Sequence, residues 1–445
     1  MTHTIRRTFW VTGLLITGLW WWADATDWAT VANWLGWRSL FMQYSGVMAM
    51  VAMTMAMVLA ARPVVLEPWL GGLDKMYRLH KWLGIAALVV SVVHWLGAQG
   101  PKWLIGWGLL TRPARGPRPP PPDAVLAQFF QGQRGLAEGV GEWAFYGAVV
   151  LIALALFKRF PYRYFFKTHR LLAVAYLALV WHSAVLMQWA YWFTPLGVLM
   201  ALGMAAGTAA ALRVLTRRVA VQRQVVGEVE ALRPYEAAGV LAMDIRLRGR
   251  WPGHESGQFA FLTLHEDEGP HPYTMASAWV DDGRITFVIK GLGDYTRTLP
   301  DRVRVGDVVK VEGPYGRFNF QGTCPRQIWV GAGIGVTPFI ARMQALAKAP
   351  DGRAVDLFHP TSALDEAALA RMQEDADAAG VRLHVLLSQR DGRLNAQRLT
   401  EAVPQWREAE VWFCGPAAFG RQLRQDLEAM GLPPGRFHQE LFEMR

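Results

Sequence analysis

Long apolar segments, separated by short charged stretches, dominate the first half of the chain. We count six of them between Phe9 and Leu212. They cover residues 8–23, 40–61, 80–98, 143–157, 169–187 and 193–212. A helix of about 20 apolar residues crosses the roughly 30 Å hydrocarbon core of a bilayer, because each residue adds about 1.5 Å. The sequence therefore predicts a bundle of six transmembrane helices.

The first of these segments also fits a signal peptide. Arg6 and Arg7 precede it, and Ala23-Asp24-Ala25 resembles a cleavage site. Three consecutive Trp residues stand just before that site, and they favour an anchor that is retained.

Basic residues set the expected orientation of the helices. Residues 1–220 hold 20 Lys and Arg against 7 Asp and Glu, whereas residues 221–445 hold 26 against 29. A basic excess confined to the apolar half is typical of the flanks of membrane spans and not of a nucleic-acid surface. With the N-terminus inside, most of these basic residues fall on the inner side, and the Pro-rich stretch 114–122 falls in an outer loop. We therefore expect a multi-pass protein of the plasma membrane (the inner membrane in a bacterium), surrounded by lipid, with both termini and the soluble domains cytoplasmic and no nucleic-acid partner.

The second half of the chain has the pattern of a soluble protein. Short alternating runs at 225–230, 241–247, 258–264 and 284–290 predict strands of a small antiparallel β-barrel. From the strand predicted at 327–330 onward, helical and strand patterns alternate, which indicates a parallel α/β domain. The expected domains are residues 1–220 in the membrane, 221–322 as a barrel and 323–445 as a nucleotide-binding domain.

Histidine, and not cysteine, is the candidate metal ligand. Cys324 and Cys414 are the only cysteines, so a disulfide framework, a cysteine zinc site and a cysteine-ligated iron–sulfur cluster are excluded. The apolar half, beyond its terminus, holds four histidines on the third and fifth predicted spans: His80, His94, His169 and His182.

These four histidines match in depth. Both spans run outward, so His80 pairs with His169, and His94 with His182, at two levels about 21 Å apart. Two such pairs are what two haems need to move electrons stepwise across a bilayer; the alternative is histidines that only hydrogen-bond between helices. His169 and His182 differ by about 140° on an ideal helix, so the fifth span requires a bulge or an irregular turn.

Two glycine-rich segments suggest phosphate binding. The turn Gly331-Ala332-Gly333-Ile334-Gly335 follows a strand and precedes a helix that begins near Thr337 and Pro338, which is the context of a dinucleotide site. The segment Lys290-Gly291-Leu292-Gly293-Asp294-Tyr295-Thr296 places small residues before a short helix, whose free N–H groups bind anions. The alternative for each segment is an ordinary turn.

Several motifs occur together in one order. A H-x13-H helix and a H-x12-H helix are followed by HPYT, KGLGDYT, GAGIGVTPF, FCGP and FHQELF. This ordered set resembles the ferric reductase and NADPH oxidase superfamily, over spans two to six and all of the soluble half. In that family the four histidines ligate two b-type haems, and a ferredoxin-reductase-like unit binds FAD and NAD(P)H.

The resemblance also implies roles for individual residues. It places Thr274 in a hydrogen bond to the isoalloxazine, with Pro272 and Tyr273 packed beside it, and His271 where soluble relatives use Arg for the pyrophosphate. It places Cys414, with Gly415 and Pro416, near the nicotinamide. It stacks Phe442 on the flavin, although Glu443-Met444-Arg445 follow here, unlike in oxidases that end on the aromatic residue. The residues expected at the reacting groups are thus Thr274, Cys414 and Phe442.

The sequence prediction is a transmembrane oxidoreductase. Cytoplasmic NAD(P)H reduces FAD, and electrons then reach an outer acceptor, O2 (giving superoxide) or a ferric chelate, through two b haems. The Arg found after the second nucleotide-domain strand of many NADPH-using relatives is missing, but Ser388 and Arg390 can bind a 2′-phosphate, so we favour NADPH and leave NADH open. The alternatives are a module that supplies a periplasmic acceptor protein or quinone, and a haem-free membrane-anchored flavin reductase.

Overall fold

The computed structural model describes residues 3–24, 31, 33–111, 124–157, 159–363 and 365–440. Its chain divides into two compact units. The first consists of residues up to 63 and of residues 75–219. The second consists of residues 64–74 and the chain from Ala220 onward. The Pro-rich stretch 114–122 and Phe442 lie outside the described residues.

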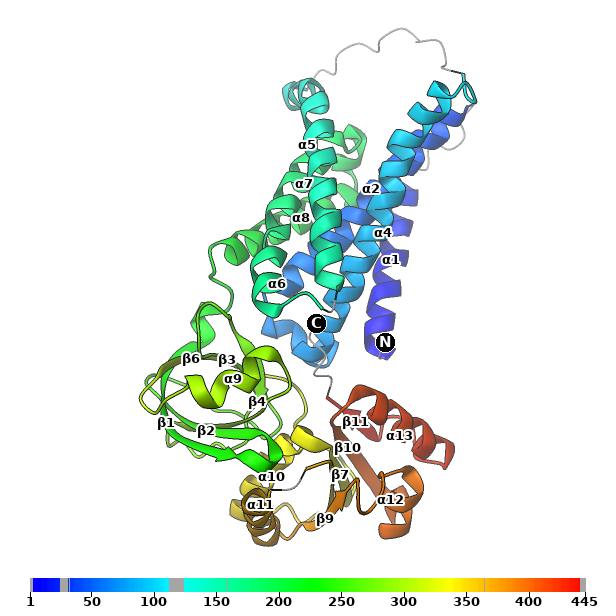
Figure 1. Ribbon diagram of the computed structural model, residues 1–445. Helices are drawn as coiled ribbons and strands as arrows, with labels where there is room; N and C mark the ends of the chain where they lie inside the picture. Colours follow the sequence, from blue (N-terminus) through cyan, green and yellow to red (C-terminus); the bar gives the residue numbers. More distant parts are fainter. Residues whose placement is uncertain are drawn as a thin grey trace. The chain divides into compact units, whose positions relative to one another are not determined.

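The first unit is helical (Figure 1). Its helices are α1 (His3–Ala23), α2 (Trp34–Ala60), α4 (Leu73–Gly106), α5 (Val125–Leu156), α6 (Tyr162–His169), α7 (Leu172–Leu186) and α8 (Pro195–Leu215). Within the described ranges, five segments are long and apolar enough to cross a membrane: Trp34–Ala60, Leu73–Gly106, Val125–Leu156, Tyr162–Leu186 and Pro195–Leu215. α1 forms where the first span is predicted, but it is not among these five, so the sixth span stays a prediction.

Two helices are longer than their apolar segments. α4 has 34 residues and α5 has 32, so both continue into the predicted 99–142 loop. Hydropathy marks the part of a helix that lies in lipid, whereas the main-chain hydrogen bonds of a helix continue for as long as the residues tolerate them. The predicted loop boundaries were therefore wrong by 8 residues at the end of α4 and by 18 at the start of α5.

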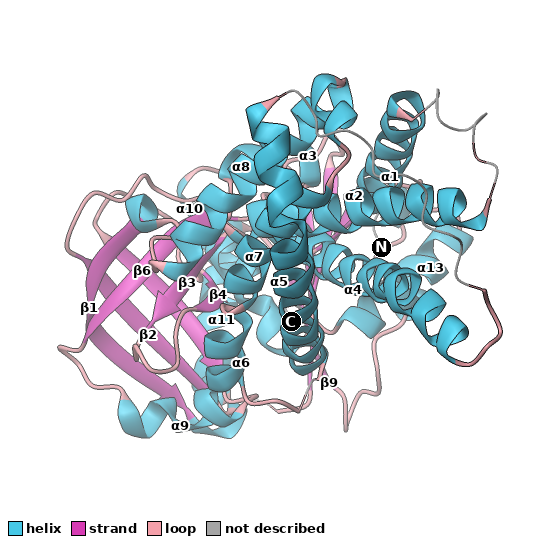
Figure 2. Cartoon of the chain, turned by 90° about the horizontal axis from the view of Figure 1, so that it is seen from above, coloured by secondary structure: helices cyan, strands magenta, loops and turns pink. Residues whose placement is uncertain are grey.

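The second unit contains two sheets (Figure 2). The antiparallel sheet has the order β4-β3-β6-β1-β2-β5. Its strands are β1 (Gln224–Tyr235), β2 (Val240–Leu247), β3 (Phe259–Thr263), β4 (His271–Thr274), β5 (Arg284–Lys290) and β6 (Val308–Tyr315). The four predicted strands are confirmed, β4 forms at the segment HPYT, which we expect to end a strand, and β6 was not predicted. A single bridge, between Met275 and Phe287, links the two edges of this sheet.

The other sheet is parallel, with the order β11-β10-β7-β8-β9. Its strands are β7 (Arg326–Gly331), β8 (Ala354–Thr361), β9 (Arg382–Leu387), β10 (Ala409–Cys414) and β11 (Phe437–Gln439). The helices of this part are α10 (Thr337–Lys348), α11 (Glu366–Ala379), α12 (Ala396–Ala402) and α13 (Ala417–Ala429). The chain leaves β7 toward β8 on one side and later returns to β10 on the other. The carboxyl ends of β7 and β10 are therefore the topological switch point, where open parallel sheets bind ligands.

Candidate functional site

Four histidines form two facing pairs inside the helical unit. The ring centroids of His80 on α4 and His169 on α6 are 5.8 Å apart, and those of His94 on α4 and His182 on α7 are 6.4 Å apart. A metal–imidazole bond is about 2 Å long, so two axial rings on one metal ion have their centroids about 6 Å apart. Both pairs therefore have the separation of axial ligands that share one metal.

The neighbouring helices fix the orientation of three of these rings. Nδ1 of His80 donates to the carbonyl oxygen of Ala56 at 2.9 Å, and Nδ1 of His182 donates to that of Ala137 at 2.8 Å. A carbonyl oxygen only accepts, so Nδ1 carries the proton and Nε2 keeps its lone pair. A hydrogen bond of this kind on the second nitrogen is the usual support of a metal-ligating histidine.

His94 is oriented by a side chain. Its Nδ1 lies 2.9 Å from Oγ of Ser45, which itself donates to the carbonyl oxygen of Phe41 at 2.6 Å. The hydroxyl proton is used in that second bond, so Nδ1 of His94 is the donor to Ser45. Nε2 of His94 thereby keeps its lone pair.

A glycine on α5, Gly141, makes room for the ring of His182. A Cβ atom added to Gly141 of α5 would lie 2.0 Å from Nδ1 of His182. The ring fits against α5 only because position 141 is glycine. By contrast, a Cβ added to Gly147, two turns along the same helix, would meet no atom within 4 Å.

The helix of the fifth predicted span is broken between its two histidines. α6 ends at His169 and α7 begins at Leu172. Between them, Leu171 N–H donates to the carbonyl of Thr168, and Ala173 N–H to that of Arg170. Bonds of this i to i+3 type tighten the turn to three residues, so each residue rotates the chain by about 20° more than in an α-helix. The irregular turn expected from the spacing is present, immediately after His169.

These pairs differ from a site built by protein ligands alone. Among the residues that the structure describes, no group of three or more His, Cys, Asp or Glu could hold a metal ion. Each facing pair supplies only two nitrogens. It therefore fits an iron whose other four ligands belong to a planar macrocycle, as in haem.

The predicted flavin segments meet at one end of the antiparallel sheet. The ring of His271 on β4 stacks on that of Tyr295 in α9 (Asp294–Arg302), with centroids 4.8 Å apart. Thr274, at the other end of β4, is buried, and Pro272 and Tyr273 between them are partly exposed. The strand HPYT and the segment KGLGDYT are thus brought together, as the resemblance implies.

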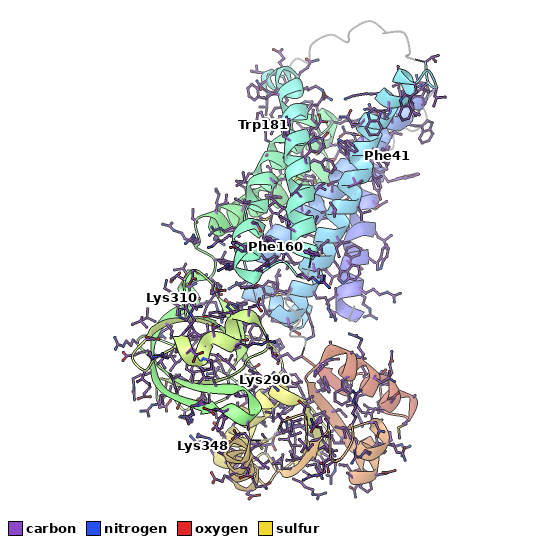
Figure 3. The ribbon with its side chains drawn as sticks, viewed as in Figure 1. Phe41, Phe160, Trp181, Lys290, Lys310 and Lys348 are labelled. Carbon is purple, nitrogen blue, oxygen red and sulfur yellow. The ribbon has the colours of Figure 1, made fainter. Side chains whose placement is uncertain are left out.

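His271 is uncharged at neutral pH. Burial lowers the pKa of His271, and its Nδ1 donates to the carbonyl oxygen of Gly269 at 3.2 Å. It can donate or accept hydrogen bonds, but it does not replace the positive charge of an Arg at a pyrophosphate. Charge near this segment comes instead from Lys290, at the end of β5 and labelled in Figure 3, and from the exposed Arg297.

The segment before α9 is partly capped by its own side chain. Oγ1 of Thr296 accepts hydrogen bonds from the main-chain N–H groups of Leu292 and Gly293, at 3.1 and 3.0 Å. The first bond into the helix runs from Arg297 N–H to the carbonyl of Gly293. The N–H groups of residues 294–296 precede that bond and have no acceptor within the helix. These are the groups available to an anion, with Gly291 and Gly293 keeping the approach free of side chains.

The three glycines of the turn after β7 have different roles. Gly333 has φ +57°, and a Cβ there would meet no atom within 4 Å, so this position is open to a ligand. A Cβ at Gly335 would lie 2.2 Å from the carbonyl oxygen of Cys414, and one at Gly331 would lie 2.8 Å from Cα of Val336. Gly331 and Gly335 are therefore required by packing within the protein, whereas the role of the turn in binding a dinucleotide stays a prediction.

A cleft adjoins this turn. It lies between β1, β2 and β5 on one side and α10, α11 and the end of β8 on the other, and its lining includes Lys290, Gly333 and Ile334. Thr337 is buried at the start of α10, and Pro338 lies in the first turn of that helix. Backbone groups, glycine and the cationic side chains of Arg233, Lys290 and Arg371 thus line a single space at the switch point.

Cys414 and Arg390 have immediate protein partners. Cys414 is fully buried at the end of β10, and burial, with a smaller effect of Glu440, raises the pKa of its thiol, so it is no thiolate. Gly415 and Pro416 follow it into α13. Arg390 donates from Nε and Nη2 to both carboxylate oxygens of Asp391, at 2.9 and 3.0 Å. Ser388 follows β9, and its N–H donates to the carbonyl of Thr361.

Sequence reasoning missed several residues that complete these sites. Ala56 and Ala137 act through main-chain oxygens, which no side-chain pattern reveals. Ser45 and Gly141 are ordinary helix residues until their histidine neighbours are known. His359 is buried at the cleft, where its Nδ1 donates to the carbonyl of Gly331 at 2.8 Å. Its position at the end of a buried strand beside the glycine turn is the signal that would have identified it.

Comparison with known families assigns two parts of the chain. Residues 45–180 match the family described as ferric reductase like transmembrane component. Residues 245–320 match the oxidoreductase FAD-binding domain family.

Several individual proteins are similar to parts of the chain. An NADPH oxidoreductase of Mycobacterium tuberculosis is 30% identical over 167 residues, which are 36% of this chain and 43% of that protein. The stachydrine N-demethylase reductase subunit Stc4 of Rhizobium meliloti is 28% identical over 207 residues (42% and 58%), and the flavohemoprotein of Deinococcus radiodurans is 27% identical over 230 residues (48% and 52%). The chain thus spans about half the length of these curated relatives. Among solved structures, a flavohemoglobin from Malassezia yamatoensis covers 91% of this chain and 98% of its own, with 17% identity and a TM-score of 0.48.

Proposed function

We propose that this chain, in which a ferric-reductase-like transmembrane component precedes an oxidoreductase FAD-binding domain, moves electrons across the membrane from cytoplasmic NAD(P)H to an acceptor on the far side. The observation that carries the proposal is the two facing histidine pairs on helices long enough to span the bilayer. The proposal includes α1 as a sixth span, a closed barrel around the flavin and both termini in the cytoplasm.

The residues fit three kinds of group. His80 with His169 would hold an inner b haem, and His94 with His182 an outer one. The segments 271–274 and 290–296 would hold FAD, and the turn 331–335, with Cys414 and Gly415 opposite, would hold the coenzyme. When bound, the flavin accepts a two-electron hydride and releases single electrons, which is the only form in which a haem carries them.

The protein itself orients the histidine rings and keeps the acceptor from binding as a metal ligand. The hydrogen bonds from Nδ1 fix the imidazole planes of His80, His94 and His182 and make their Nε2 atoms more basic. Each histidine pair would hold a haem without leaving its iron a free position, so an acceptor such as O2 or a ferric chelate would receive electrons without becoming a ligand. Gly333 lets the coenzyme approach the backbone, and His359 holds the carbonyl of Gly331 in place. We favour NADPH over NADH, with Arg390 released from Asp391 to meet the 2′-phosphate.

The visible spectrum of the purified chain tests the central claim. Two b haems give an intense Soret band, and its absence would leave the haem-free flavin reductase as the function. His94→Leu is expected to remove one haem of two and to leave FAD reduction by NAD(P)H intact. Val93→Leu, at an exposed neighbouring position on α4, is the control. Equal haem content in the wild type and His94→Leu would refute the assignment.

A further inference from the structure

Three polar side chains meet within the apolar part of the helical unit. Oε1 of Glu142 on α5 accepts a hydrogen bond from Nε2 of Gln99 on α4 at 2.9 Å and another from the hydroxyl of Tyr146 at 2.6 Å. Both donors share one carboxylate oxygen. In the part of the chain that the structure describes, the hydrogen bonds of this cluster leave Oε2 of Glu142 for a further partner. Gln99, Glu142 and Tyr146 are called the polar cluster below.

The polar cluster lies at the outer ends of the predicted spans 80–98 and 143–157, close to the outer histidine pair. Glu142 is 14 residues from the end of α5, or about 21 Å along a helix whose apolar stretch qualifies as a span. Gln99 is five residues beyond His94, and Glu142 is five residues from Ala137, the partner of His182, so each lies about 7.5 Å along its helix from the pair. An ionisable side chain at such a depth is costly, and it marks a functional site.

Aromatic rings line the space between the polar cluster and the histidines. Trp95, which follows His94, stacks on Phe145 with centroids 5.7 Å apart and planes at 22°. The edge of Trp95 also meets Tyr146 at 6.1 Å. Tyr146 is 37% exposed and Trp143 is 77% exposed on the same face of α5. The cluster is therefore exposed through Tyr146 and Trp143 on this face of α5, and Trp95 connects it to the segment of α4 that carries His94.

We propose that the polar cluster, with Trp95, Phe145 and Trp143, binds the headgroup of a lipid-soluble quinone that enters from the bilayer. The inference rests on the proposed function, and it names the class of acceptor. A quinone is a flat ring that stacks on aromatic side chains. One carbonyl oxygen accepts from the second N–H of the Gln99 amide, and the other accepts from the hydroxyl of Tyr146 when this hydroxyl leaves Oε1 of Glu142. A water-soluble acceptor such as a ferric chelate has no use for a carboxyl group that faces lipid.

The reaction at this site balances as NAD(P)H + H⁺ + quinone → NAD(P)⁺ + quinol. The coenzyme is oxidised by two electrons and the quinone is reduced by the same two, which arrive singly through the outer histidine pair. Each quinone oxygen gains one proton, so two C–O–H groups replace two C=O groups. Glu142 passes each proton from Oε2 and regains it from the extracytoplasmic water. The role of Glu142 is thus proton delivery.

The test uses the full chain in nanodiscs with decylubiquinone as the probe. NAD(P)H oxidation is followed with decylubiquinone and, separately, with ferricyanide, a soluble acceptor that needs no proton. Glu142→Gln is expected to lower decylubiquinone-dependent turnover at least tenfold and to leave the ferricyanide rate and the Soret band unchanged. Tyr146→Phe, which removes one hydroxyl, is expected to raise the KM for decylubiquinone severalfold. Val150→Leu, exposed on the same helix, is the control.

Binding is measured independently of turnover by photolabelling with an azidoquinone. We expect the azidoquinone to label α5, and we expect an excess of decylubiquinone to prevent this labelling. Labelling elsewhere would overturn the proposal. Equal loss of both rates in Glu142→Gln would mean that the polar cluster only holds α4 and α5 together, and it would overturn the proposal. An unchanged decylubiquinone rate in this variant would overturn the proposal as well. If the wild type reduces ferricyanide but not decylubiquinone, the quinone site is refuted and the proposed function is not. If the wild type contains no haem, or reduces neither acceptor, the proposed function itself is refuted.

Discussion

Glu67 is a buried carboxyl group in the segment that joins α2 to α4. It begins the short helix α3 (Glu67–Leu70), which belongs to the second unit, and it is 5% exposed. Its Oε1 has no hydrogen-bond partner among the described residues. Burial raises the pKa of Glu67 from 4.5 to about 7, against the opposing effects of the Gly316 main chain, Arg223 and Arg317 and with a small contribution from Asp74. The second unit therefore carries a site at which charge is disfavoured.

The pKa fixes the sign and the size of the effect on stability. The folded form binds the proton more tightly than the unfolded form, so stability is greatest below pH 4.5 and falls as pH rises to 7. One pH unit corresponds to 1.36 kcal/mol, so the full penalty above pH 7 is about 3 kcal/mol. Glu67→Gln keeps the shape and removes the charge. It is expected to stabilise the second unit by up to about 3 kcal/mol at pH 8 and to change little at pH 4.

Thermal unfolding of the full chain in detergent, followed by FAD release between pH 4.5 and 8, measures this difference. The midpoint of the wild type should fall across the window relative to that of Glu67→Gln, and the two should converge at its acidic end. Glu255→Gln, a change at an exposed acid with the same loss of charge, is the control. Parallel pH profiles for the wild type and Glu67→Gln would refute the reasoning, because they would mean that Glu67 titrates as an exposed group.

Three further predictions concern the sites. Gly141→Val should displace the ring of His182 and lower the haem content by about half, whereas Gly147→Val should not; equal spectra would contradict the packing role. Arg390→Ala should raise the KM for NADPH severalfold and leave the KM for NADH unchanged. Asp391→Asn, which frees Arg390, should lower the KM for NADPH. Steady-state kinetics with both coenzymes measure these changes. NAD(P)H added to sealed right-side-out vesicles should be oxidised only after permeabilisation, and full activity beforehand would invert the topology.

The sequence predicted those features that depend on the pattern of side chains. Alternation of apolar residues identified β1, β2, β3 and β5, because one face of each strand is buried. It missed β6 (Val308–Tyr315), for which no strand was predicted within the barrel domain. The four histidines were paired correctly in space, because membrane depth follows from sequence position once the helices span the bilayer.

Main-chain geometry could not be predicted in the same way. The spacing of His169 and His182 required an irregular turn, but its position at Arg170 and Leu171 depends on local i to i+3 bonds that leave no mark in the sequence. The glycine turn was read as a ligand site throughout, whereas Gly335 is glycine because the carbonyl of Cys414 occupies the place of its Cβ. A close approach between distant backbones is a tertiary property, and residue type alone does not distinguish it from space kept for a ligand.

The hydrogen bonds of the histidines also define the smallest helical unit that can hold both pairs. α4, α6 and α7 carry the four rings, but Ala56 and Ser45 on α2 and Ala137 on α5 orient three of them. Helices without any ligand are therefore as necessary to the site as those that bear one, because an unoriented imidazole binds metal weakly. α1 and α8 supply none of these contacts. The range that matches the ferric-reductase-like family begins at Ser45 and ends two residues before His182, so it includes three of the four histidines and excludes α1 and α8.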